Sequence, residues 1–286
     1  MATERPERVD VHLHLTTYWP DLPRNSYGPD VPFHLEGLLG ELDRAGVASG
    51  LVLSTHHVPE LGEALEESRR QVQGGGGRLW AVGTVDPTKG PEAVATALQR
   101  WGEAPGLVGL KLYPGYLPFY PHDPRLDPVY EFAARRRLPV MIHQGDTMDP
   151  SARLKFARPI EVDEVAVRYR DVRFVLCHLG NPWVEEAAEI VYKNENVYAD
   201  TSGLLGSPKL PYFARMLTEA RERVEGVLAY IGHSDRLLFG SDWPLLSIGS
   251  SLSLIEELRV PEEDRQAILG RNARRLFRLP AAGPVA

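Results

Sequence analysis

Eight short apolar runs at regular spacing constrain the fold of this chain more than any other feature. The runs begin about 33 residues apart on average, and each is followed by turn residues and then by a stretch with helical spacing. This interval is the length of one strand, one helix and two loops. Several runs are apolar at nearly every position, as strands buried on both faces are. The runs cover residues 8–15, 50–56, 78–85, 106–113, 138–145, 172–180, 196–203 and 236–244.

The segments between the runs predict helices. Residues 34–45 carry four leucines on one stripe, and Gly46 follows as a stop signal. A second helix is predicted over 124–137, and a third over 182–193 with Asn181 as its N-cap. Strand–helix alternation repeated eight times favours a closed α/β barrel, the (β/α)8 TIM barrel, over an open doubly wound sheet.

Length, charge and cysteine content narrow the class of protein further. The 286 residues fit a single barrel domain spanning 1–286, because such barrels take about 250 residues. A net charge of −7 argues against nucleic acid or an anionic membrane as a partner. The polar N-terminus and the lack of a long apolar segment predict a cytoplasmic protein. Cys177 is the single cysteine, and its apolar run predicts a buried structural thiol.

Residues able to bind a metal stand at the ends of four runs. The first run ends in His12 and His14, the fifth in His143, the sixth in His178 and the eighth in Asp242. In a barrel, side chains at the carboxyl ends of the strands meet at one mouth, and alternation along a strand turns His12 and His14 to the same side. Imidazole and carboxylate suit Zn²⁺, Mn²⁺ or Fe²⁺. The pattern therefore predicts a divalent metal site with an open position for water.

The chain resembles the amidohydrolase superfamily of TIM-barrel metal enzymes, and most closely its amidohydrolase-2 branch. This branch includes aminocarboxymuconate-semialdehyde decarboxylase and related decarboxylases, hydratases and hydrolases. The matching motifs follow the family's order over nearly the whole chain and are DVHLH (10–14), GLKLYP (109–114), DPRLDPVYEFA (123–133), PVMIHQGD (139–146), FVLCHLGNPW (174–183), NVYADTSG (196–203) and LLFGSDWP (237–244).

The resemblance implies roles for these residues. His12, His14 and His143 would be metal ligands, with Asp242 as the acidic ligand and a catalytic group. His178 would be a catalytic acid or base beside the metal. We expect one divalent ion, zinc first, with manganese and iron as alternatives. The resemblance is also compatible with a homodimer.

Lys111 lies on the predicted fourth strand, where binuclear members of the superfamily carry a carboxylated lysine that bridges two metals. The amidohydrolase-2 branch commonly holds one metal without this bridge. We therefore expect Lys111 to be an inward-facing cation that orients the substrate or helps to position Asp242, and the bridging role is the alternative.

Aromatic and basic residues near the strand ends are candidates for substrate contact. Arg153 and Arg158 lie in the long loop 146–159, which with loop 16–33 is a candidate wall or lid of the site. The consecutive histidines His56 and His57 lie at the end of the second run, and we favour turn residues without a role over substrate contact, which is the alternative. The aromatic candidates are Tyr18, Trp19, Tyr113, Trp183 and Trp243, in a wider group that includes Tyr116 and Phe119.

Three functions remain open on the sequence alone. The first is a metal-dependent hydrolase that uses metal-activated water on a small amide, ester or lactone. The alternative is a lyase, either a non-oxidative decarboxylase or a hydratase, acting on a small carboxylic acid. A non-catalytic metal-binding protein is the third. In each enzymatic case the partner is a small molecule.

Overall fold

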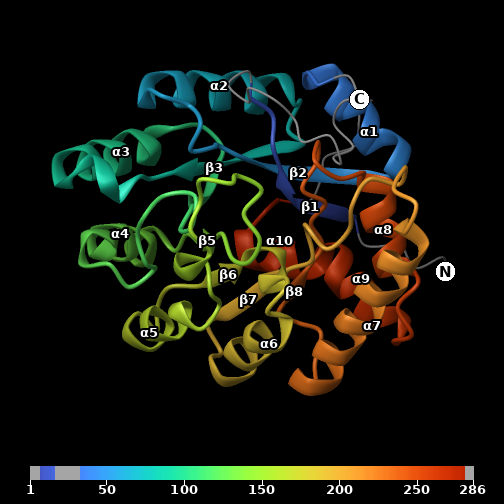
Figure 1. Ribbon diagram of the computed structural model, residues 1–286. Helices are drawn as coiled ribbons and strands as arrows, with labels where there is room; N and C mark the ends of the chain where they lie inside the picture. Colours follow the sequence, from blue (N-terminus) through green and yellow to red (C-terminus); the bar gives the residue numbers. More distant parts are fainter. Residues whose placement is uncertain (1–6, 17–32, 281–286) are drawn as a thin grey trace.

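The computed structural model describes residues 7–16 and 33–280. Within them, eight parallel strands form one sheet in the order β1 to β8, surrounded by helices (Figure 1). The predicted TIM barrel is confirmed, and each apolar run contains one strand or overlaps one. The strands are β1 (Arg8–Leu13), β2 (Val47–Leu53), β3 (Leu79–Thr84), β4 (Leu107–Leu112), β5 (Val140–Ile142), β6 (Phe174–Leu176), β7 (Val197–Asp200) and β8 (Leu237–Leu238).

Backbone hydrogen bonds between the first strand and the segment after the last strand close the barrel. The amide of Val11 donates to the carbonyl of Phe239 at 3.0 Å, and the amide of His14 donates to the carbonyl of Trp243 at 2.7 Å. The amide of Asp242 also donates to the carbonyl of His12, at 2.9 Å. The closure therefore joins the very segments that carry three of the predicted site residues.

The helices alternate with the strands. They are α1 (Leu35–Ala45), α2 (Leu61–Gly74), α3 (Pro91–Glu103), α4 (Asp127–Arg136), α5 (Glu161–Arg168), α6 (Val184–Lys193), α7 (Phe213–Ile231), α8 (Ile248–Glu256), α9 (Glu262–Gln266) and α10 (Asn272–Phe277). The predicted stop at Gly46 is confirmed, because this residue has a φ of 62° and its amide caps the end of α1. The segments described include no helix with the length and apolar character that a membrane span requires.

The predicted start of the third helix is wrong. The helix α6 begins at Val184, and Trp183 occupies the N-cap position without a side-chain hydrogen bond. Asn181 lies at the end of a preceding 3₁₀ turn (Cys177–Gly180), where its side-chain oxygen accepts a hydrogen bond from Arg223 at 3.0 Å. The side-chain oxygen of Asn181 therefore bonds to Arg223 on α7 instead of capping α6.

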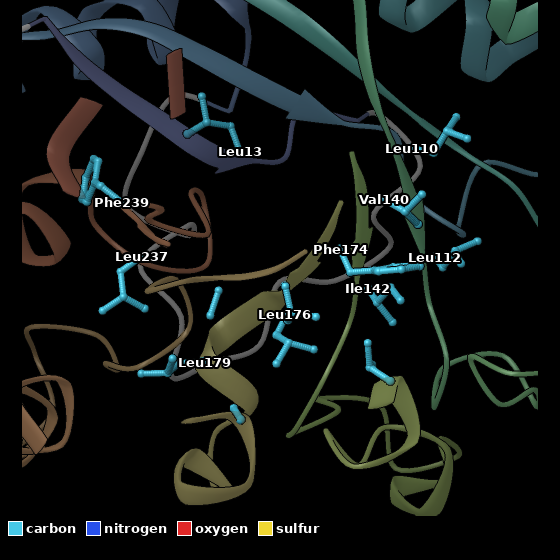
Figure 2. Close-up of a cluster of buried hydrophobic side chains, with 14 of the residues drawn as sticks. Leu13, Leu110, Leu112, Val140, Ile142, Phe174, Leu176, Leu179, Leu237 and Phe239 are labelled. Atoms are coloured by element: carbon cyan, nitrogen blue, oxygen red, sulfur yellow. The ribbon is translucent and has the colours of Figure 1, made fainter. Parts of the chain in front are cut away.

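Two apolar cores hold the strands in place. The larger core lies between the sheet and the outer helices, and Figure 2 labels part of it: Leu13, Leu110, Leu112, Val140, Ile142, Phe174, Leu176, Leu179, Leu237 and Phe239. The smaller core fills the barrel interior with residues such as Val11, Met141 and Val175. Ala273 and Phe277 of α10 belong to this inner core, and α10 lies in the middle of the ring of strands in Figure 1.

The strands end earlier than the apolar runs from which they were predicted. Run eight was predicted over 236–244, whereas β8 spans only Leu237–Leu238, and β5 and β6 end before His143 and Cys177. The polar residues that follow therefore leave the hydrogen-bonded ladder at the carboxyl ends of the strands. This is the mouth of the barrel, where active sites of this fold are built.

Candidate active site

Side chains from separate strands meet in one cavity at this mouth. The cavity has a volume of about 230 Å³, below the range of roughly 300–1,000 Å³ typical of ligand pockets, which favours a small ligand. It is lined by His12, His14, Thr55, His56, His57, Lys111, Tyr113, Tyr116, His143, Met148, Asp149, Pro150, His178, Asp242 and Leu245. All five residues expected at the metal site are among them.

In three of the histidines, one ring nitrogen is fixed by an acceptor outside the cluster. Nδ1 of His12 lies 3.0 Å from the Asp200 carboxylate, and Nδ1 of His14 lies 3.3 Å from the carbonyl of Leu53. Nε2 of His143 lies 3.0 Å from the carbonyl of Asp146. Such contacts fix the ring orientation and turn the second nitrogen of each ring toward the cluster, where it could bind a metal.

The remaining ring nitrogens face one another and a carboxylate. Oδ1 of Asp242 lies 3.5 Å from Nε2 of His12 and 3.4 Å from Nε2 of His14. Nδ1 of His143 lies 3.2 Å from Nε2 of His178. Nε2 of His12 is buried and has no hydrogen-bond partner among the described residues. A buried nitrogen without a partner is costly, and a bound cation would satisfy it.

The protonation states suit a cation. Burial, and then the charge of Lys111, lowers the pKa of His12 to about 3, so its ring is neutral at pH 7. Burial also lowers the pKa of His143 well below its usual value. Burial raises the pKa of Asp242, but the hydrogen bond from His14 and the charges of the imidazoles outweigh it and hold this pKa well below its usual range. Neutral imidazoles and an ionised carboxylate are the forms that bind metals.

His178 sits on a strained turn directly after β6. Its φ is 60° and that of Leu179 is 47°, a left-handed conformation that is uncommon for residues other than glycine. Gly203 accommodates the ring, because a Cβ at that position would lie 2.5 Å from Nδ1 of His178. The turn aims the imidazole at His143 and Asp242 rather than along the strand.

Asp200, at the end of β7, connects the two parts of the site and was missed in the sequence. Its carboxylate accepts hydrogen bonds from His12 and, at 3.0 Å, from the backbone amide of His178. The Ser202 hydroxyl bonds to the same carboxylate and lies 2.9 Å from Nδ1 of His178. The seventh run ends in polar residues just as the first, fifth, sixth and eighth do, so the signal was present in the pattern.

Lys111 is buried and faces inward, as expected. Its Nζ donates to Sγ of Cys177 at 2.8 Å, and Cys177 is buried as predicted. Ligand-capable atoms of His12, Cys177 and Asp200 lie within 4.8 Å of one another, which is a second group that could hold a metal. The ammonium of Lys111 is the positive charge beside that group.

The predicted substrate contacts are only partly brought to the cavity. Tyr113 lines it, and its hydroxyl donates to the carbonyl of Ser54 at 2.9 Å. Trp183 does not line it, and its ring packs against Arg158 at 4.6 Å. Trp243 is fully buried and packs against Phe33, so it belongs to the rim of the core. Tyr18 and Trp19 lie outside the described residues.

The basic candidates of loop 146–159 also point elsewhere. Arg158 forms an ion pair with Glu186, and Arg153 is exposed. The loop still contributes a wall through Met148, Asp149 and Pro150. Arg153 and Arg158 therefore do not line the cavity as we expected, because Arg158 pairs with Glu186 on α6 and Arg153 faces solvent.

His56 and His57 line the cavity, which agrees with the alternative of substrate contact rather than with the favoured interpretation as turn residues without a role. The rings of His56 and Tyr116 are 4.7 Å apart, and those of Tyr116 and His143 are also 4.7 Å apart. The hydroxyl of Tyr116 accepts a hydrogen bond from the amide of Met148 at 3.2 Å. A row of aromatic rings thus runs from the candidate metal ligands along one wall.

The barrel and the buried cluster at its mouth define a TIM-barrel protein of the metal-dependent enzyme class. The family model described as amidohydrolase matches residues 9–279, and the chain belongs to that family. The gamma-resorcylate decarboxylase of Polaromonas sp. (strain JS666) is 24% identical over 239 residues, 68% of each chain.

Solved structures share the fold at lower sequence identity. The 2,6-dihydroxybenzoate decarboxylase from Rhizobium is 20% identical, with a TM-score of 0.66 over 96% of this chain and 99% of that one. The 5-carboxyvanillate decarboxylase of Novosphingobium aromaticivorans DSM 12444 is 14% identical, with a TM-score of 0.71 over 96% of each chain. Its structure holds manganese and 4-hydroxy-3-methoxy-5-nitrobenzoic acid.

Proposed function

We propose that this protein is a metal-dependent decarboxylase of a small aromatic carboxylic acid. The observation that carries the proposal is the buried cluster of three imidazoles and one carboxylate, which opens with His178 onto a small aromatic-walled cavity. Three relatives that act on aromatic acids support the choice of reaction. The sequence alone favoured hydrolysis, and the relatives favour the alternative.

His12, His14, His143 and Asp242 would hold one divalent ion. Nitrogen and oxygen donors of this kind suit manganese, iron or zinc, and manganese in the Novosphingobium enzyme favours that metal over zinc as the first to test. When bound, the ion would hold the substrate carboxylate in place and offset its negative charge.

His178 would supply the proton that decarboxylation requires. The bond between the ring carbon and the carboxylate carbon breaks, its electron pair stays on the ring carbon, and carbon dioxide leaves. The ring carbon takes a proton from Nε2 of His178, which then recovers one from solvent. Burial lowers the pKa of His178 in the free protein, and the negative charge of a bound carboxylate would favour its protonated form.

Asp200 and Ser202 would position that imidazole. Both contact His178, one through its backbone amide and the other through Nδ1, so they hold Nε2 toward the cavity. Among the described residues that line the cavity, Lys111 is the one lysine, and there is no arginine. We expect it to attract the acid and to orient it over the cluster.

The test compares carbon dioxide release with hydrolysis by the same manganese-loaded protein. The acids are 2,6-dihydroxybenzoate and 5-carboxyvanillate, and the hydrolysis panel holds aryl esters, amides and lactones. The proposal predicts carbon dioxide from at least one aromatic acid and no hydrolysis. Hydrolysis without release of carbon dioxide from any aromatic acid would overturn it and restore the hydrolase hypothesis.

A further inference from the structure

A second cavity adjoins the same cluster. Its volume is about 270 Å³, and it shares His143, His178 and Asp242 with the first cavity. Tyr116 and Met148 also line both. The two cavities therefore meet at the residues where the reacting group would bind, and they extend from there in different directions.

The two cavities differ in the chemistry of their walls. The walls that belong only to the first come from the ends of β1, β2 and β4 and from the loop after β5, and they include Thr55, His56 and Lys111. Those that belong only to the second come from the segments after β5, β6, β7 and β8 and from α7. Their apolar members are Leu204, Leu205, Leu210, Met216 and Leu246.

Two polar residues, Asn181 and Asp146, also line the second cavity away from the shared cluster. The side-chain oxygen of Asn181 accepts a hydrogen bond from Arg223, and its backbone carbonyl accepts one from the amide of Asp146 at 2.8 Å. The side chain of Asp146 is exposed. The wall formed by the four leucines and Met216 suits an apolar group that gains free energy by leaving water.

The first cavity, in contrast, offers unused hydrogen-bonding atoms. Oγ1 of Thr55 and Nδ1 of His56 are buried without a partner among the described residues. The ring of His56 stands 4.8 Å from that of Tyr113 and 4.7 Å from that of Tyr116. A flat ring with a hydroxyl group would stack on this wall and satisfy these atoms.

We propose that the second cavity binds an apolar substituent of the substrate, so that the preferred substrate is a hydroxylated aromatic acid with an alkyl group next to its carboxylate. The inference rests on the proposed function, because the ring acid defines what lies at the cluster. We place the alkyl group next to the reacting carbon, because His143, His178 and Asp242, where the carboxylate would bind, line both cavities.

The experiment measures binding of salicylate and of its 6-methyl, 6-ethyl and 6-propyl derivatives to the manganese-loaded protein by titration calorimetry. Each buried methylene contributes about 0.8 kcal/mol, so affinity should rise about fourfold with each added carbon. The 5-alkyl isomers should show no such rise, because position 5 is remote from the junction of the cavities. Trapping of carbon dioxide in the same samples reports turnover.

Two variants test the wall itself. Leu210→Asn makes the wall of the second cavity polar, and Met216→Trp fills the cavity. In both variants the 6-alkyl salicylates should bind no tighter than salicylate. Leu154→Asn changes an exposed leucine that lines neither cavity and should leave the whole series unchanged. Thr55→Val should weaken binding of every salicylate and leave the rise with chain length intact.

The outcomes separate this inference from the proposed function. Salicylate that binds with no gain from 6-alkyl groups, or a gain that survives both Leu210→Asn and Met216→Trp, overturns the second cavity as an alkyl site and leaves the decarboxylase proposal standing. Failure of every salicylate to bind, together with the absence of carbon dioxide from any aromatic acid, overturns both.

Discussion

At the scale of single residues, the candidate site depends on contacts to the ring nitrogens that point away from the cluster. The carboxylate of Asp200, at the end of β7, contacts Nδ1 of His12 on β1 and the backbone amide of His178 after β6. Burial raises the pKa of Asp200, but the charge and hydrogen bond of His12 outweigh this and lower it. Asp200 is thus a charged positioning residue for two parts of the site.

Replacing Asp200 should therefore weaken metal binding. We expect Asp200→Asn to bind manganese about 10- to 100-fold more weakly, because outer partners of metal-binding histidines have effects of this size. Titration with manganese against a competing chelator measures the change. Asp171→Asn removes an exposed carboxylate and serves as the control. Equal manganese affinities for Asp200→Asn and the unaltered protein would rule out this role.

Lys111 gives a second prediction at this scale. Lys111→Met should lower kcat/KM for an aromatic acid by about 10- to 100-fold, the effect of losing one charge-assisted hydrogen bond. The metal content should stay at one ion per chain, because Lys111 donates a hydrogen bond to the thiol of Cys177 and is not expected to be a metal ligand. A fall from two ions to one in this variant would instead favour the bridging role.

At the scale of elements, the turns after β6 and β7 decide where His178 points. The left-handed turn at His178 leaves its ring against Gly203, which itself has a φ of +67°. Neither feature follows from apolar periodicity, because the pattern predicts strands and leaves the conformation of the turns open. Local hydrogen bonds of Asp200 and Ser202 determine that conformation.

Gly203→Ala should accordingly displace His178. We expect a loss of roughly 100-fold or more in kcat, as for removal of a general acid, with the metal content unchanged. Gly232→Ala is the matched control, because that glycine also has a positive φ, of +77°, but faces open space. It should cost about 1–2 kcal/mol of stability and leave turnover intact. Equal effects of both substitutions on kcat would show that backbone strain alone is responsible.

The elements also show what the sequence could predict. Buried parallel strands need continuous apolar runs, so all eight runs could be found, and the polar residues at their ends marked the mouth. The N-cap at Asn181 was predicted wrongly because its oxygen bonds to Arg223 on another helix. Trp183 and Trp243 were expected in the cavity, but packing partners distant in the chain determine their orientation.

At the scale of the whole molecule, a bound metal would link three strands directly. The candidate ligands follow β1, β5 and β8, and the contacts behind them extend to β2 and β7. A ligand that binds only the folded chain at about 1,000 times its dissociation constant adds about 4 kcal/mol of stability. Removing the metal with a chelator should then lower Tm by roughly 8 °C or more, measured by calorimetry. An unchanged Tm would indicate that no such ion stabilises the barrel.

The metal content of the purified protein tests the central claim most directly. Elemental analysis after purification without chelator should find about one divalent ion per chain, manganese or zinc, and almost none in His143→Ala or Asp242→Ala. Leu154→Asn should retain the ion. No metal in the unaltered protein, and none taken up on incubation with manganese or zinc, would contradict the account of this site.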